Sequence, residues 1–305
     1  MTRFLVTGVS GLLGLNFALA VDGRKHQVIG VAHTTPLTWV NFKFMHAELT
    51  GPGVVEKLVE ETKPGVILHC AAIANLEACE ANPEQAAEVN GQLPGVIAAS
   101  AQKHGIQMIH ISTDAVFDGA KGDYLETDPP NPLSVYARTK WQGEQAVLAA
   151  NPQALIVRVN FYGWSISGTR SLGEFFVNNL EQGKTMKGFT DILFCPMMVL
   201  DLADMLVEAA QKQLHGIYHL VGGQAMSKYD FGVAIARTFG FDESLISPAS
   251  VLDGGLTAAR SPNLTLNTDK ITKALGHDLP EFERGLAKFH AQYRHGFPQY
   301  IRSLS

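Results

Sequence analysis

The stretch TGVSGLLG, residues 7–14, stands between a short β-branched and aromatic run and a longer apolar segment. Gly8, Gly11 and Gly14 recur at every third position within it. Between a strand and a helix, the first glycine permits a tight turn and the second lets the backbone approach a pyrophosphate. The third lets the helix pack closely on the sheet, and the free N–H groups of the helix attract the anion. The stretch therefore predicts a dinucleotide-binding βα unit, with a ligand-free glycine-rich turn as the alternative.

Outward from this stretch, apolar runs alternate with helical patterns. We expect strands at residues 3–7, 26–32, 66–72, 106–111, 154–160 and 216–222, and helices at 11–21, 82–105, 132–150 and 202–214, the second of them interrupted near Gly91 and Pro94. This alternation predicts the α/β class, with a parallel sheet covered on both faces.

The expected architecture is a doubly wound parallel Rossmann sheet with a smaller C-terminal substrate-binding lobe. Residues 1–160 and 191–222 would form the dinucleotide-binding domain, and residues 161–190 and 223–305 the lobe. The lobe would lie beyond the carboxyl ends of the strands, where such sheets bind ligands.

A second informative stretch runs from HISTDAVFDG, residues 110–119, to PLSVYARTK, residues 132–140. We expect Ser112, Thr113 and Asp114 to be exposed at a strand end. Tyr136 and Lys140 should share one helix face because they are four residues apart. An ammonium held near a phenol favours the phenolate and lowers the pKa of the tyrosine. A threonine hydroxyl can hold the other side of a polarised carbonyl group. These residues predict proton transfer beside a carbonyl or an alcohol.

The end of the second expected strand bears on the choice of cofactor. An acidic residue there would bind the ribose hydroxyls of NAD, but this chain has His33 followed by Thr34 and Thr35. Since no carboxylate repels a 2′-phosphate at this point, the sequence favours NADP(H), with NAD(H) as the alternative.

Composition excludes several classes of function. Of 305 residues, 46% are apolar and 17% charged, and the net charge of −5 argues against a nucleic-acid or anionic-membrane surface. No apolar run reaches the roughly 18 residues of a membrane span. Cys70, Cys79 and Cys195 are widely spaced, which indicates reduced thiols of a cytoplasmic protein. The histidines show no metal-ligand spacing: His215 and His219 are four apart, but residues 216–222 are an expected strand, so the two would not share a helix face. We expect a small-molecule enzyme that needs no metal.

Several motifs together resemble one family over essentially the whole chain. TGVSGLLG, AAIANLEACE, AAEVN, HISTDAVFDG, PLSVYARTK and RSPNLTLNTDKI resemble an extended short-chain dehydrogenase/reductase. Within that superfamily the pattern is similar to the dTDP-4-dehydrorhamnose reductase branch, which carries STD-x-VFDG, then Y-x-x-x-K and a late R-P-x-N-x-x-L-N-T segment. The resemblance implies an NAD(P)-dependent oxidoreductase that reduces a keto group of a sugar or nucleotide sugar.

The same resemblance implies roles for the catalytic residues. Tyr136 would be the general acid, and Lys140 would bind the nicotinamide ribose and lower the pKa of the tyrosine. Thr113 would hydrogen-bond the reacting oxygen. Asn90 would position a proton-relay water, and Asp114 would belong to the substrate or proton network.

Cofactor and substrate contacts are also implied by the resemblance. Besides Tyr136 and Lys140, the cofactor residues would be Gly8, Ser10, Gly11, Leu12, Leu13, Gly14, His33, Glu48, Leu49, Ala71, Ala72, Val159 and Asn160. The substrate would meet Asp114, Ala115, Trp164 and Arg260. Ala115 stands where the family commonly has tyrosine, so the sugar is expected to differ. Asn263-Leu264-Thr265-Leu266 lacks the family's usual arginine, which weakens the case for a nucleotide diphosphate and leaves Arg260 to pair with one.

Two alternatives to the reductase remain open at this point. An epimerase or dehydratase would keep NAD⁺ tightly bound and return the hydride to the substrate. A non-catalytic cofactor-binding regulatory subunit is the other alternative, because the same branch includes a methionine adenosyltransferase regulatory subunit. The superfamily also suggests a homodimer.

Overall fold

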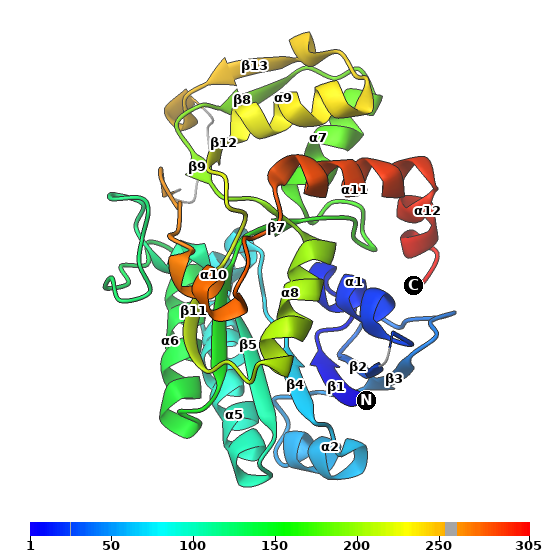
Figure 1. Ribbon diagram of the computed structural model, residues 1–305, viewed down its shortest axis with the longest axis vertical. Helices are drawn as coiled ribbons and strands as arrows, with labels where there is room; N and C mark the ends of the chain where they lie inside the picture. Colours follow the sequence, from blue (N-terminus) through cyan, green and yellow to red (C-terminus); the bar gives the residue numbers. More distant parts are fainter. Residues whose placement is uncertain (25, 254–260) are drawn as a thin grey trace.

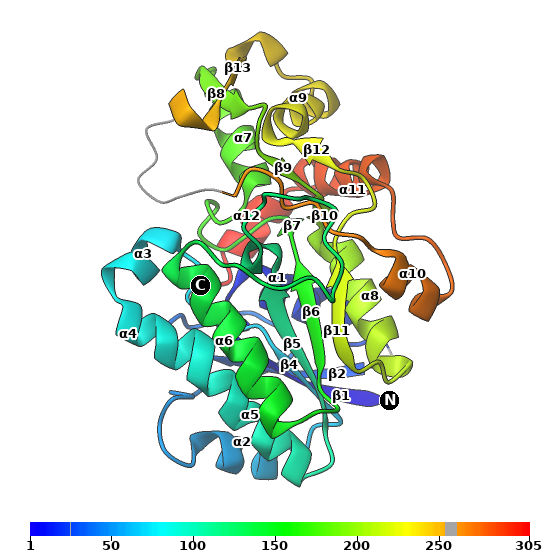
Figure 2. The ribbon, with the colours of Figure 1, turned by 90° about the vertical axis from the view of Figure 1, so that its left-hand side faces the viewer.

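The computed structural model describes residues 1–24, 26–253 and 261–305. A parallel sheet of seven strands in the order β11-β6-β5-β4-β1-β2-β3 forms its centre (Figures 1 and 2). The strands are β1 (Thr2–Thr7), β2 (His26–Ala32), β3 (Lys43–His46), β4 (Val66–His69), β5 (Gln107–Thr113), β6 (Leu155–Val159) and β11 (Gly216–Leu220). The strand order reverses between β1 and β4, and such a switch point is where doubly wound sheets bind ligands. The predicted Rossmann-type fold is confirmed.

Helices cover both faces of this sheet because successive strand residues point to opposite sides. Figure 1 shows α1 (Leu12–Val21) and α8 (Val199–Gln211) on one face, with α5 (Leu93–Lys103) and α6 (Val135–Ala150) on the other. Phe4 and Val6 of β1 pack in the core on the α1 side, and Leu5 between them packs in a second core with residues of α5. The second core also includes residues of α2 (Val54–Thr62).

A smaller layer lies beyond the carboxyl ends of the strands, at the top of Figure 1. It brings together segments that are far apart in sequence, since β8 (Met186–Phe189) pairs in parallel with β13 (Ile246–Ala249). Its other elements are α7 (Leu172–Glu181), β9 (Leu193–Phe194), β12 (Met226–Ser227), α9 (Lys228–Phe239), the 3₁₀ turns Glu243–Leu245 and Val251–Asp253, and α11 (Phe282–Arg294).

Two parts of the last fifty residues return to the sheet instead of staying in this layer. The helix α10 (Asp269–Leu275) lies beside β11. Beyond α12 (Phe297–Arg302), the Leu304 carbonyl accepts a hydrogen bond of 2.7 Å from the Thr38 amide, which follows β2. The division of the chain into two domains therefore stays a prediction.

The region between β4 and β5 differs from expectation. The helix α3 (Leu76–Ala81) was not predicted, and β4 ends at His69 instead of continuing to residue 72. The interruption expected near Gly91 is wrong, since α4 (Pro83–Ala86) continues through a π-helical turn (Ala87–Gln92) into α5. The π turn absorbs an extra residue, and Pro94 falls in the first turn of α5, where a missing N–H costs little.

The short edge strand β3 was also missed, because its four residues KFMH are partly or fully exposed and show no apolar run. Two-residue strands β7 (Phe161–Tyr162) and β10 (Met197–Met198) pair with each other near the end of β6. Among the described residues, no helix is both long and apolar enough to cross a membrane.

Candidate active site

A cleft of about 270 Å³ opens at the switch point of the sheet. Its walls come from the ends of β1, β2, β3 and β4 and from segments much later in the chain. The lining residues are Gly8, Ser10, Gly11, Val31, Ala32, His33, Thr34, Thr35, Ala47, Glu48, Leu49, Thr50, Cys70, Ala71, Ala72, Ile73, Gln85, Val89, Leu93 and Arg170. Of the cofactor residues expected from the sequence, eight are in this set.

The floor of the cleft is the glycine turn. Gly8 has φ +64°, and a Cβ there would lie 2.6 Å from the Ala71 amide nitrogen. A Cβ at Gly14 would lie 2.5 Å from the Gly8 carbonyl oxygen, so α1 packs against the turn without room for a side chain. Gly11 caps α1 without a side-chain hydrogen bond, and the first turn of α1 has no acidic residue. The N–H groups at this helix end can therefore bind an anion.

One end of the cleft carries a histidine–carboxylate pair. His33 Nε2 lies 2.5 Å from Glu48 Oε2. The Thr50 hydroxyl also donates to Glu48, over 2.9 Å, and these contacts hold the pKa of the Glu48 carboxyl below its usual value, the Thr50 bond being the main cause. The Glu48 carboxylate thus already has hydrogen-bond partners within the protein, and the neighbouring Thr34 and Thr35 line the same cleft.

The proposed catalytic groups meet where β5 ends against α6. Ser134 caps α6 by accepting a hydrogen bond from the Ala137 amide, and this fixes the first turn that carries Tyr136. Burial raises the pKa of Tyr136 to about 12, opposed in part by a hydrogen bond with Thr113. The phenol is therefore protonated at neutral pH and within reach of the Thr113 hydroxyl, as a proton donor should be.

Lys140 does not act on this phenol as the sequence suggested. Its Nζ donates to the Ile111 carbonyl oxygen over 2.6 Å, and burial lowers the pKa of Lys140 to about 8. The expected lowering of the Tyr136 pKa is therefore wrong for this structure, because burial of the phenol raises that pKa.

Asp114 follows Thr113 and is enclosed by the protein. Asn160 Nδ2 donates to Asp114 Oδ2 over 2.6 Å, and the Thr113 hydroxyl donates to Oδ1 over 3.1 Å. Burial raises the pKa of Asp114 to about 6. Ser112, Thr113 and Asp114 are 2%, 7% and 4% exposed, so the prediction that they are exposed is wrong. The packing of α6 over β5, which buries these residues, cannot be inferred from a linear motif.

Asn90 lies on the π-helical turn and braces two segments. Its amide exchanges hydrogen bonds with the backbone of Ile73, accepting from the N–H over 2.8 Å and donating to the carbonyl over 3.0 Å. It also donates to the Thr139 hydroxyl over 3.3 Å. Asn90 therefore ties the loop after β4 to α6, and its role in positioning a water stays a prediction.

Several other expected contacts lie elsewhere. Leu13 and Val159 are each 4% exposed and their side chains belong to the core, while Leu12 does not line the cleft. Trp164 is 1% exposed and stacks on Phe289 with ring centroids 4.1 Å apart, so its expected contact with the substrate is wrong. An aromatic residue just past a strand end fits a pocket wall or a core equally well in sequence.

The two other residues expected to contact the substrate are Ala115 and Arg260. Ala115 is half-buried directly after Asp114, and its amide donates to the Thr113 hydroxyl. Arg260 lies outside the described residues.

Sequence reasoning missed several residues of the cleft, among them four that lie away from the strand ends. Gln85, Val89 and Leu93 come from the continuous helical segment after α3, and Arg170 comes from the loop before α7. The helix residues follow the expected N-terminus at Asn82-Pro83, so a register argument could have found them. No local pattern marks Arg170.

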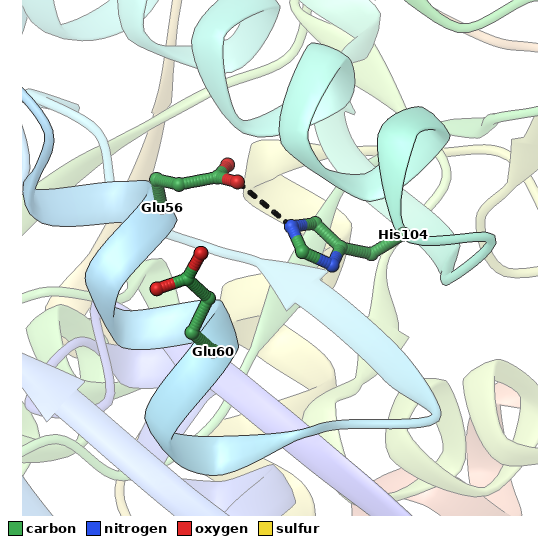
Figure 3. Close-up of side chains that lie close together, drawn as sticks. All are labelled: Glu56, Glu60 and His104. Atoms are coloured by element: carbon green, nitrogen blue, oxygen red, sulfur yellow. Dashed lines mark hydrogen bonds and ion pairs between the residues drawn. The ribbon is translucent and has the colours of Figure 1, made fainter.

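A second group of polar side chains lies outside the cleft. Glu56 and Glu60 of α2 face His104, which follows α5 (Figure 3). The Glu56 carboxylate already bonds the Lys103 ammonium and His104 Nε2, and these contacts, led by Lys103, lower its pKa to about 2. We assign no metal here, because Lys103 occupies the carboxylate that an ion would need.

The family model of the RmlD substrate binding domain matches residues 2–295. The chain belongs to this family. The resemblance inferred from the motifs is thereby confirmed.

Curated relatives of this RmlD-family chain match over nearly their whole length. It is 33% identical to the probable low-salt glycan biosynthesis reductase Agl14 of Haloferax volcanii, covering 94% of this chain and 97% of that protein. It is 30% identical to the dTDP-4-dehydrorhamnose reductase of Aggregatibacter actinomycetemcomitans, covering 95% and 99%. It is also 30% identical to mouse methionine adenosyltransferase 2 subunit beta, covering 93% and 86%.

Solved structures agree on the fold. A dTDP-4-dehydrorhamnose reductase of Clostridium acetobutylicum superimposes with a TM-score of 0.84 at 27% identity, covering 96% of this chain and 99% of that one. The dTDP-4-dehydrorhamnose reductase of Bacillus anthracis, solved in complex with NADP, gives a TM-score of 0.86 at 23% identity, covering 95% and 99%.

Proposed function

We propose that this chain reduces a keto group of a nucleotide sugar with NADPH, using Tyr136 as the general acid. The observation that carries the proposal is the meeting of Tyr136, Thr113 and Asp114 at the carboxyl edge of the sheet that also holds the glycine turn. Reductases of nucleotide sugars and glycans among the relatives support it.

Each residue has a distinct task in this proposal. When bound in the cleft, NADPH would supply the hydride that the carbonyl carbon of the substrate accepts. Tyr136 donates its phenolic proton to the carbonyl oxygen, and the Thr113 hydroxyl orients that oxygen by a hydrogen bond. Lys140, whose Nζ reaches the end of β5 at the Ile111 carbonyl, would bind the nicotinamide ribose. Asp114 and Asn160, which are hydrogen-bonded to each other, form the polar wall of the site beside these groups.

The preference for NADPH rests on the adenosine end of the cleft. His33, Thr34 and Thr35 line it, and its single carboxylate, Glu48, is occupied by His33 and Thr50. The relative from Bacillus anthracis binds NADP. NAD(H) remains the alternative cofactor.

The test is turnover of NADPH and NADH with a panel of nucleotide sugars that carry a 4-keto group. Wild-type protein should oxidise the cofactor only when a keto substrate is present. Tyr136→Phe should bind the cofactor normally and lose about 10²- to 10⁴-fold in kcat, as expected for a positioned acid. Near-normal turnover by Tyr136→Phe would contradict the assignment.

The same assay separates the alternatives. An epimerase or dehydratase would copurify with NAD⁺ and show no net consumption of NADPH. A regulatory subunit is favoured by one specific observation, the 30% identity to mouse methionine adenosyltransferase 2 subunit beta. That function predicts dinucleotide binding without turnover and co-elution with the catalytic subunit of a methionine adenosyltransferase.

Three further expectations complete the proposal. Residues 1–160 and 191–222 bind the dinucleotide, and residues 161–190 and 223–305 bind the sugar. The three cysteines are free thiols, which fits the reducing cytoplasm. A homodimer is expected, and light scattering of the purified protein tests it.

A further inference from the structure

The loop between β7 and α7 lies across the start of α1. Asn16 of α1 is fully buried, and its side-chain amide donates to the Trp164 carbonyl oxygen of this loop over 2.8 Å. The same amide donates to the Leu12 carbonyl oxygen over 2.8 Å. A Cβ at Gly163 would lie 3.6 Å from the Leu12 side chain. The loop is therefore fixed beside the helix end that forms the floor of the cleft.

A single buried carboxylate holds the rest of the loop. Glu174, fully buried in the first turn of α7, accepts hydrogen bonds from the Ser165 amide over 2.6 Å and from the Arg170 amide over 2.9 Å. Ser171 completes a capping box with it. Because the buried Glu174 carboxylate accepts hydrogen bonds from several groups of the loop, it holds the loop backbone, including that of Arg170, in one conformation.

The side chain of Arg170 lines the cleft together with Gly8, Ser10 and Gly11. It is exposed, and within residues 1–24, 26–253 and 261–305 no side-chain hydrogen bond or ion pair of Arg170 is formed. The only acidic residue of the cleft, Glu48, is already engaged by His33. Arg170, with its backbone held by Glu174, thus lines a cleft that also offers free helix N–H groups and whose one carboxylate, Glu48, already has hydrogen-bond partners.

We propose that the Arg170 guanidinium binds the pyrophosphate of the dinucleotide. This inference rests on the proposed function, since it requires a dinucleotide in the cleft. A planar guanidinium makes two parallel hydrogen bonds to phosphate oxygens, and it adds a full positive charge to the partial charge of the α1 N-terminus. Because Arg170 directly precedes the Ser171 cap of α7, the cofactor also becomes linked to the layer that holds the sugar in our proposal.

Binding of NADPH and NADH to the full-length protein, followed by calorimetry, tests the inference. Arg170→Met, which keeps the aliphatic part of the side chain, should weaken both ligands about 10- to 100-fold and by the same factor, because both contain the pyrophosphate. Arg170→Lys should lose less, since a point charge remains. The affinity of the wild type should also fall more steeply with salt than that of Arg170→Met.

Arg284→Met provides the matched control, because Arg284 is an exposed arginine on α11 outside the cleft. It should bind both ligands like the wild type. Unchanged affinity in Arg170→Met would overturn the inference while leaving the proposed function intact. A loss confined to NADPH would also overturn it, because the arginine would then contact the 2′-phosphate. Failure of the wild type to bind either ligand would remove the proposed function itself.

Discussion

Glu144 and Arg158 form a bidentate ion pair buried beneath the proposed catalytic residues. Arg158 Nε donates to Glu144 Oε1 over 3.0 Å and Nη2 donates to Oε2 over 2.8 Å, with side chains 2% and 0% exposed. Ser112 also donates to Glu144 Oε1, over 2.5 Å. Glu144 stands one turn after Lys140 on α6, and Arg158 belongs to β6. The pair therefore joins α6 to the two strands whose ends carry Thr113 and Asn160.

Glu144→Ala should destabilise the protein by about 3–5 kcal/mol, because it leaves the buried Arg158 charge unpaired. The double variant Glu144→Leu with Arg158→Met should lose less than the single one, since no buried charge remains. Urea denaturation of the variants measures both values. If the stability lost by the double variant equalled the sum of the losses in Glu144→Leu and Arg158→Met alone, the two side chains would not be coupled and the ion pair would not account for the loss.

Asp114→Asn should become more stable than the wild type as pH rises. The folded-state pKa of Asp114 is raised by burial from 3.8 to about 6, so its contribution to stability is full below pH 4 and is lost as pH rises to 6. An uncharged asparagine avoids this loss. The gain over the wild type should grow between pH 4 and 6, to about 3 kcal/mol at most, and stay constant above. Thermal unfolding across this range measures it, and a gain independent of pH would contradict it.

His33→Asp should shift the preference from NADPH towards NADH. A carboxylate at this place would repel the 2′-phosphate, at a cost of roughly 1–4 kcal/mol for unit charges about 4 Å apart near a surface. The Kd for NADPH should rise about tenfold or more relative to that for NADH. His215→Asp, at an exposed position outside the cleft, is the control and should change neither value. An equal loss of affinity for NADPH and NADH would show that the 2′-phosphate does not bind near His33.

Gly8→Ala should lose both stability and cofactor binding. Gly8 and Gly53 both have positive φ, of +64° and +73°, so alanine at either pays about 1–2 kcal/mol for that conformation. Only at Gly8 does the new Cβ meet backbone, 2.6 Å from the Ala71 amide nitrogen, whereas nothing lies within 4 Å of the one at Gly53. Chemical denaturation and NADPH titration should show a larger loss for Gly8→Ala and normal binding by Gly53→Ala. Similar behaviour of both variants would mean that the close approach is unimportant.

Much of the fold was predictable from local patterns in the sequence. The glycine spacing of residues 7–14 and the six longer apolar runs predicted the parallel sheet, because buried strands and tight turns depend on side chains close in sequence. The edge strand β3 and the π-helical turn at Ala87–Gln92 were missed. An exposed strand has no apolar signal, and a π turn keeps the composition of an α-helix.

The candidate site was predictable only as a set of residue types. Thr113, Tyr136 and Lys140 were identified by their spacing and by the family they resemble. Their protonation was not, since the pKa of Tyr136 is set by the surrounding protein and is raised to about 12. Trp164 was assigned to the substrate, but its ring stacks on Phe289, which is 125 positions later in the chain.

The sequence by itself determined the nucleotide-binding βα turn, the order of strands and helices, and the residues capable of proton transfer. Each of these depends on neighbours within a few positions. Only the tertiary structure decided that Asp114 is buried, that Lys140 bonds the Ile111 carbonyl, and that Arg170 faces the glycine turn. Burial and charge at those places come from segments distant in the chain, and desolvation depends on the whole surrounding fold.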